Sequence, residues 1–162
     1  MARRWRPLVG VLVAASLAAI AASGVASAGQ VVKLDAHMDG ASELPPADPD
    51  GDGRAKFEFD LDTGEVCFSV RFDDIGTPNR AHIHVGGPEV NGAIVLPMFE
   101  LRPGDAPASD PRHDELEGGR LGDCVTADPD LLADIAADPG GYYVNLHNTR
   151  FPGGAIRGQL EG

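Results

Sequence analysis

The chain has 162 residues, of which 25 are Asp or Glu and 13 are Lys or Arg, which gives a formal net charge of −12 at pH 7. A strongly negative surface repels the phosphates of nucleic acids and the headgroups of anionic lipids, so neither is expected as a partner. The length suits one domain that buries its own hydrophobic core.

The first 28 residues have the three parts of a secretory signal peptide. Arg3, Arg4 and Arg6 give a positive start, residues 8–22 form an apolar run, and residues 26–28 (Ala-Ser-Ala) offer a small-residue cleavage site. The alternative is a membrane anchor, but a spanning helix needs roughly 20 apolar residues. We therefore expect export, to the periplasm or the medium, and no membrane span in the mature protein.

Cleavage after residue 28 would leave a single domain of residues 29–162. Because the signal contains three arginines and no acidic residue, its removal moves the net charge from −12 to −15. The remaining sequence consists of short alternating apolar and polar runs separated by Gly, Pro, Asn and Asp, a pattern typical of antiparallel sheets. The expected strands are 32–38, 55–61, 66–72, 81–85, 93–98, a strand around Cys124, 142–147 and 155–160.

Three connections carry signals of their own. Residues 62–64 (Asp-Thr-Gly) predict a tight turn that joins the second and third strands into a hairpin. Asp128 and Pro129 predict the start of a short helix, which Pro139 ends, between two strands. Residues 102–119 are rich in Pro, Gly and charge, and predict a long exposed loop.

The chain has two cysteines, Cys67 and Cys124, and both lie in the exported part. An even pair in an oxidising compartment predicts a disulfide. By the chain-entropy model, closing this loop stabilises the fold by about 4 kcal/mol. The alternative, two free thiols acting in catalysis or on a metal, lacks a Cys-x-x-Cys spacing.

Two of the expected strands carry a pattern that suits a metal site. His82 and His84 are two residues apart and therefore share one face of a strand, while Tyr143, Asn145 and His147 share the polar face of another. If these strands are neighbours, the three histidines converge, and three imidazoles are enough for a copper or zinc site with an open position. The alternative is that the rings make ordinary hydrogen bonds within the fold.

Other polar residues give weaker signals. Residues 48–53 (Asp-Pro-Asp-Gly-Asp-Gly) open like a calcium-binding EF-hand loop, but Phe59 stands where the bidentate Glu is needed, so an acidic turn is the better interpretation. Arg157 lies on the polar face of the last strand, where an ion pair with Glu43 and simple exposure are both open. No nucleophile motif or phosphate-binding loop is present, so no catalytic residues are predicted.

Five segments together resemble the CHRD domain, named after chordin. They are Ser42–Pro46, Ala81–Gly86, Asn91-Gly92, Tyr143–His147 and Phe151–Leu160, and the resemblance covers about residues 31–161. It implies an all-β fold, an antiparallel Greek-key, immunoglobulin-like β-sandwich, here with one short connecting helix. It also implies that His82, His84 and His147 match histidines that recur in the family, and that no enzymatic activity is established for the domain.

Two functions follow. The first is an exported, non-enzymatic CHRD-type domain with a binding or scaffolding role toward an unknown extracellular protein or surface ligand. The alternative is a copper- or zinc-binding protein that uses the three-histidine face, with redox chemistry as one outcome.

Overall fold

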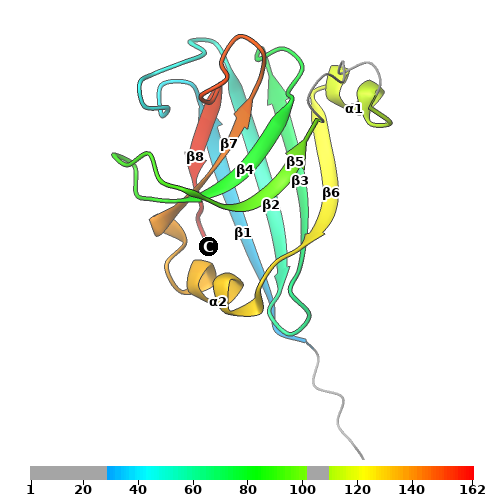
Figure 1. The fold of residues 1–162 in the computed structure, drawn as a ribbon, viewed down its shortest axis with the longest axis vertical. Helices are drawn as coiled ribbons and strands as arrows, with labels where there is room; N and C mark the ends of the chain where they lie inside the picture. The colour runs from blue at the N-terminus through cyan, green and yellow to red at the C-terminus, as the bar shows by residue number, and fades with distance from the viewer. Residues whose placement is uncertain (1–28, 102–109) are drawn as a thin grey trace, which may run out of the picture.

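The structure is a computed structural model that describes residues 29–101 and 110–162 (Figure 1). The expected signal peptide lies outside the described residues. No helix in the described part of the chain is both long enough and apolar enough to cross a membrane.

Eight strands dominate the described chain, and all eight strand predictions are confirmed, with ends that shift by up to three residues. The strands are β1 (Val31–Asp39), β2 (Asp52–Asp60), β3 (Glu65–Asp73), β4 (Arg80–Val85), β5 (Ile94–Glu100), β6 (Arg120–Thr126), β7 (Tyr142–His147) and β8 (Ile156–Gln159). The helices are α1 (His113–Glu117) and α2 (Pro129–Ala137), and a single 3-10 turn covers Pro139–Gly141.

Strict alternation of apolar and polar residues shapes β2 and β3, the two long strands of the predicted hairpin. Every second residue of both strands is buried, and the rings of Phe57, Phe59 and Phe68 pack with centroids 5.9 and 6.5 Å apart. The turn between them forms because the Asp60 carboxylate accepts two backbone N–H groups, one of them from Thr63 at 3.0 Å. Gly64 completes the turn in the left-handed region, at φ +76°.

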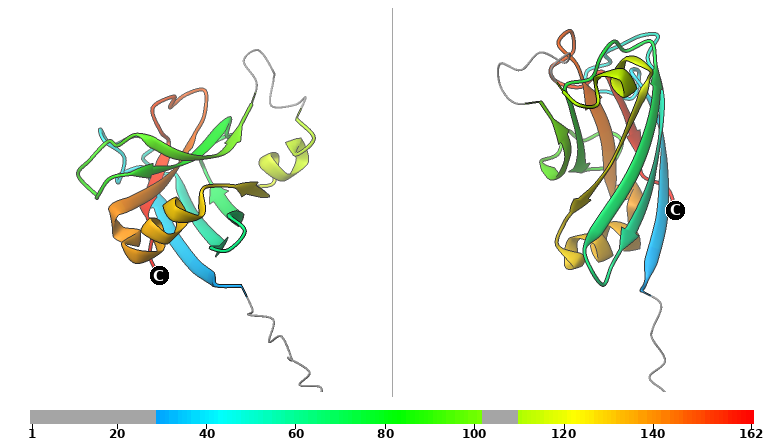
Figure 2. Two further views of the ribbon diagram at one scale, coloured as in Figure 1. Left: turned by 60° about the horizontal axis from the view of Figure 1, so that its bottom comes forward. Right: turned by 90° about the vertical axis from the view of Figure 1, so that its right-hand side faces the viewer.

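Hydrogen bonds join the eight strands into one sheet, in the order β5-β4-β7-β8-β1-β2-β3-β6. Every neighbouring pair is antiparallel. The sheet curls until its two edge strands, β5 and β6, approach each other, as the end-on view in Figure 2 shows. The all-β antiparallel prediction is confirmed, but a two-sheet Greek-key, immunoglobulin-like sandwich is not, because the strands form one nearly closed, barrel-like sheet.

The interior of the curled sheet holds the hydrophobic core, and α2 lies across one end of it (Figures 1 and 2). The Asp128 side chain caps α2 by accepting the N–H of Asp130 at 3.0 Å, and Pro129 occupies the first turn, as predicted. Leu132 and Ile135 on the inner face of the helix are fully buried. The predicted connecting helix between two strands is therefore confirmed.

A second helix was not expected from the sequence. α1 lies within residues 102–119, which were predicted to be one long exposed loop, and its Leu116 is only 1% exposed. This single buried leucine anchors α1. The charged residues around it hide the apolar pattern by which a helix is recognised in a sequence. The described part of the chain therefore has two short α-helices, not one, and residues 102–109 of the predicted loop lie outside it.

The acidic segment at residues 48–53 does not form an EF-hand. β2 begins at Asp52 and continues as a strand, so the helix that should follow the calcium loop is missing, as the sequence predicted.

Candidate functional site

Strands β4 and β7 are antiparallel neighbours, which is the arrangement that the metal hypothesis required. The register places His82 opposite Asn145 and His84 opposite Tyr143. His147 follows Asn145 by two residues and so lies diagonally across from His82 on the same face. The strand pairing therefore brings the predicted residues of both strands together.

The three imidazoles form a close cluster, here called the histidine triad (His82, His84 and His147). Nδ1 of His82 lies 3.2 Å from Nε2 of His147, and the centroids of these two rings are 5.0 Å apart. Each ring can offer one nitrogen such that the three nitrogens all lie within 4.8 Å of one another. The rings are 3%, 8% and 5% exposed in residue order, so the triad is shielded from bulk water.

Backbone carbonyl groups fix the tautomer of two rings. Nδ1 of His84 lies 3.0 Å from the carbonyl oxygen of Gly92, and Nδ1 of His147 lies 3.1 Å from that of Pro152. A carbonyl oxygen only accepts hydrogen bonds, so Nδ1 carries the proton in both rings. In the neutral rings each Nε2 therefore keeps its lone pair. Histidines that bind metals through Nε2 are arranged in the same way, since their Nδ1–H group is held by a second hydrogen-bonding partner.

The lone pair of His84 has no partner in the described part of the chain. Its Nε2 is buried and accepts no hydrogen bond. Burial also lowers the pKa of His84, and it lowers the pKa values of His82 and His147 to about 4, with the neighbouring histidines adding to the effect. The rings are therefore neutral at pH 7, which is the state that binds metal.

Asn145 and Glu43 extend the cluster on one side. The side-chain oxygen of Asn145 lies 3.0 Å from Nε2 of His147, and its amide nitrogen lies 3.4 Å from Oε1 of Glu43. Glu43 comes from the loop after β1 and is only 4% exposed; this burial raises the pKa of its carboxyl group. Asn145 therefore lies between His147 and the buried carboxyl group of Glu43.

On the other side a stack of three planar groups supports His84. The Tyr143 ring lies parallel to the His84 ring with centroids 4.8 Å apart, and the Arg157 guanidinium carbon lies 3.4 Å from the Tyr143 centroid. Arg157 also donates to the carbonyl oxygen of Gly87 at 2.8 Å. The stack fixes the plane of the His84 ring and ties β8 to the loop after β4.

Arg157 differs from both sequence-based alternatives. The alternative that Arg157 is simply exposed is wrong, because the residue is 1% exposed. Within the described residues Arg157 forms no ion pair with Glu43 either, and its guanidinium donates to Asn91, Gly87 and Gln159 instead. Arg157 therefore acts as a buried clamp on the loop that carries Gly92.

The polar face of β4 and β7 is covered by loops. Three loops cross it, residues 40–51, 86–93 and 148–155, and each reaches the triad or its neighbours through a residue described above. Val85 is 42% exposed, because β4 ends there.

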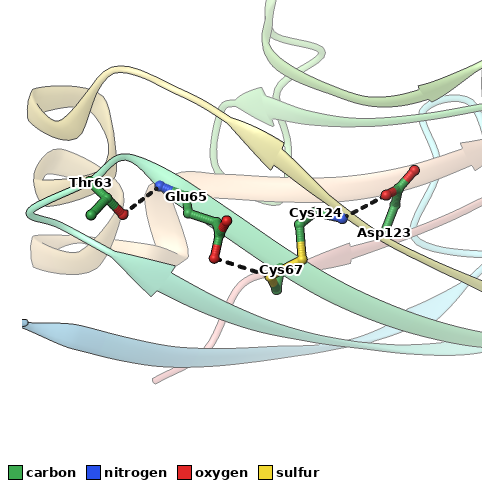
Figure 3. Close-up of a disulfide and its surroundings, with 5 residues drawn as sticks. All are labelled: Thr63, Glu65, Cys67, Asp123 and Cys124. Carbon is green, nitrogen blue, oxygen red and sulfur yellow. Dashed lines mark hydrogen bonds between the residues drawn. A yellow bond between two sulfur atoms is a disulfide. The ribbon is translucent and has the colours of Figure 1, made fainter.

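Cys67 and Cys124 form the predicted disulfide (Figure 3). The two residues are directly opposite each other on β3 and the edge strand β6. Glu65 Oε1 lies 3.8 Å from the Cys67 sulfur, so an acid and two sulfur atoms gather here. Since both sulfurs are joined, no thiolate is left for a metal, and the free-thiol alternative is wrong.

Sequence reasoning missed the residues that hold the histidines. Gly92 and Pro152 act through backbone carbonyl groups, which leave no side-chain signal. A weak signal exists for Gly92, because a side chain there would collide with the backbone of Val85, so only glycine lets the loop approach the strand this closely.

Comparison with known proteins identifies the family. A family model described as the CHRD domain matches residues 34–160, which is most of the chain. No curated protein and no solved structure matches it.

Proposed function

The chain belongs to the CHRD domain family, and on that premise we propose that it is an exported, non-enzymatic binding domain whose histidine triad holds a copper or zinc ion. Family membership supports a binding role. The Cys67–Cys124 disulfide indicates an oxidising compartment, which supports export.

The unpartnered Nε2 of His84 is the observation that carries the metal assignment. Buried polar atoms in folded proteins are nearly always hydrogen-bonded. If the triad were only a structural hydrogen-bonding cluster, the lone pair of this atom would have a donor, yet within the described residues it has none. A metal ion beside the Nε2 atoms of His84 and His147 would use both lone pairs.

The chemistry and spacing of the donors favour copper or zinc over a harder ion. Imidazole nitrogens suit zinc and copper, whereas calcium and magnesium prefer oxygen. Two nitrogens bound tetrahedrally to one zinc ion at roughly 2.0–2.1 Å are about 3.3 Å apart. The 3.2 Å between His82 Nδ1 and His147 Nε2 fits this value.

We propose that the triad holds a metal ion and does not catalyse a reaction on a substrate, because the triad is covered. Three loops and the Arg157 stack enclose rings that are at most 8% exposed, so a substrate has no open approach within the described residues. A covered site suits an ion that is held for structure, because no substrate can reach the coordination position that three histidines leave open. Binding of an extracellular protein or surface ligand elsewhere on the domain stays a prediction from the family.

The experiment is a calorimetric titration of chelator-treated protein with Zn²⁺ and, separately, with Cu²⁺. We expect one ion per chain, and a loss of affinity of about 100-fold or more in His84→Phe, since even outer-shell changes cost about 10–100-fold. Phenylalanine keeps the stack on Tyr143. The matched control is His37→Phe, on an exposed face of β1, which should bind as the wild type does. Absence of binding, or equal affinity in His84→Phe, contradicts the proposal.

A further inference from the structure

A second pocket lies away from the histidine triad, where three loops meet beside the start of β2. It has a volume of about 380 Å³. The residues that line it are Asp48, Asp74, Ile75, Gly76, Thr77, Asn148, Thr149 and Arg150. Five of these eight carry side-chain oxygen atoms, and none offers an imidazole or a thiol.

Asp48 is the unusual member of this wall, because its carboxylate is buried without support. The residue is 3% exposed, and its Oδ1 atom has no hydrogen-bond donor within the described residues. Its backbone is fixed, since the Asp48 N–H donates to the carbonyl oxygen of Ala155 at 3.2 Å. A buried carboxylate with a bare oxygen is costly unless a proton or a cation balances its charge.

The nearest charged neighbours make this imbalance larger. Asp50 and Asp74 both place further negative charge near Asp48. Burial first, and then Asp50, raises the pKa of Asp48, while Arg150 opposes the shift. Arg150 is exposed at the rim, and within the described residues it forms no ion pair with Asp48.

We propose that this pocket is a calcium site in which Asp48 supplies a buried carboxylate ligand and Asp74 supplies a second carboxylate from the pocket lining. Calcium takes six to eight oxygen ligands in flexible geometry, and carboxylates, carbonyl groups and water all serve. The side-chain atoms of the lining that could ligate a cation are all oxygens, which separates this pocket from the nitrogen ligands of the triad. The site does not depend on the function proposed for the triad.

Hydrogen bonds of Asn148 hold part of the pocket lining in place. The side chain of Asn148 donates to the carbonyl oxygen of Ile75, and its own oxygen accepts the N–H of Phe151 at 2.8 Å. These bonds tie the loop after β7 to the loop after β3 before any ion binds. A preformed pocket reduces the ordering cost of binding.

The test is thermal unfolding of chelator-treated protein with and without 10 mM CaCl₂, at matched ionic strength. A dissociation constant of about 10⁻⁴ to 10⁻³ M, usual for extracellular calcium modules, would raise the Tm by about 5–10 °C. Asp48→Asn should abolish this rise. Without calcium the same variant should be at least as stable as the wild type, because it removes the buried charge.

Two further variants keep the result specific. Asp134→Asn removes an exposed acid from α2 and should respond to calcium as the wild type does. His84→Phe should also keep the calcium response, which distinguishes this pocket from the triad. The proposal is overturned if calcium leaves the wild-type Tm unchanged, or if Asp48→Asn and the wild type shift equally.

Discussion

Nδ1 of His82 and Nε2 of His147 lie 3.2 Å apart across two antiparallel strands. In the metal-free protein this distance suits a hydrogen bond from His82, because the carbonyl group of Pro152 holds the proton of His147 on its other nitrogen. It is also the spacing of two ligands on one tetrahedral ion. A metal ion can therefore replace a proton here with little movement of the rings.

Acid should destabilise the metal-free protein through the triad. Burial lowers the pKa values of His82 and His147 to about 4, against an ordinary value of 6.5. Between these values the unfolded chain binds more protons than the folded chain, so stability falls as the pH falls. The stability that the two neutral, buried histidines contribute is complete above pH 6.5 and is lost as the pH falls through about 4. We expect the Tm of chelated protein to drop by several degrees from pH 7 to pH 4.5.

Other groups also titrate in this range, so the comparison needs a variant. His82→Gln should show a smaller drop than the wild type, whereas His37→Gln, which removes an exposed histidine, should show the wild-type drop. Equal drops in all three proteins would mean that the triad is not the source of the pH dependence.

The disulfide should stabilise the sheet at its β6 edge. Replacing Cys67 and Cys124 together by Ser frees the unfolded chain, and we expect a loss of about 2–4 kcal/mol in urea unfolding. Reductant should lower the stability of the wild type to that of the double variant and leave the variant unchanged. A double variant that unfolds at the wild-type urea concentration would refute this role.

Arg157 should not tolerate lysine. Lysine keeps the charge but loses the flat group that stacks on Tyr143 and the fork that reaches Gly87 and Gln159. We expect Arg157→Lys to cost about 3 kcal/mol in chemical unfolding. Arg54→Lys, on the exposed face of β2, should change stability by no more than about 0.5 kcal/mol. Similar effects of the two substitutions would contradict the clamp.

Gly158 should be irreplaceable where β8 meets β1. A side chain there would collide with the backbone carbonyl oxygen of His37. Gly158→Ala should cost about 3 kcal/mol or reduce the yield of folded protein, because a backbone group cannot move aside as a side chain does. Gly153→Ala is the control, since no atom lies within 4 Å of the added carbon. It should unfold as the wild type does.

The strands and the convergence of the triad were predictable because they depend on local periodicity. Alternation along the chain placed His82 with His84 and Asn145 with His147, and one further assumption, that the two strands are neighbours, brought them together. The disulfide was predictable from the count of cysteines and the expected compartment.

Features that depend on the paths of loops were not predictable. The alternation of apolar and polar residues along β1 does not indicate that the following loop folds back and buries Glu43 beside Asn145. The burial of Arg157 has the same origin, since the loop that covers it comes from residues 86–93. The single curled sheet also could not be inferred, because alternation defines two faces of a strand but not how strands are ordered.

The most direct test of the histidine triad is a long-range ¹H–¹⁵N spectrum of its imidazole rings, recorded at pH 7 before and after one equivalent of Zn²⁺. In metal-free protein, His84 and His147 should show protonated Nδ1 and bare Nε2. Zinc should shift Nε2 of both rings and Nδ1 of His82, and leave His37 unchanged. Triad resonances that stay in place with excess zinc would contradict the account.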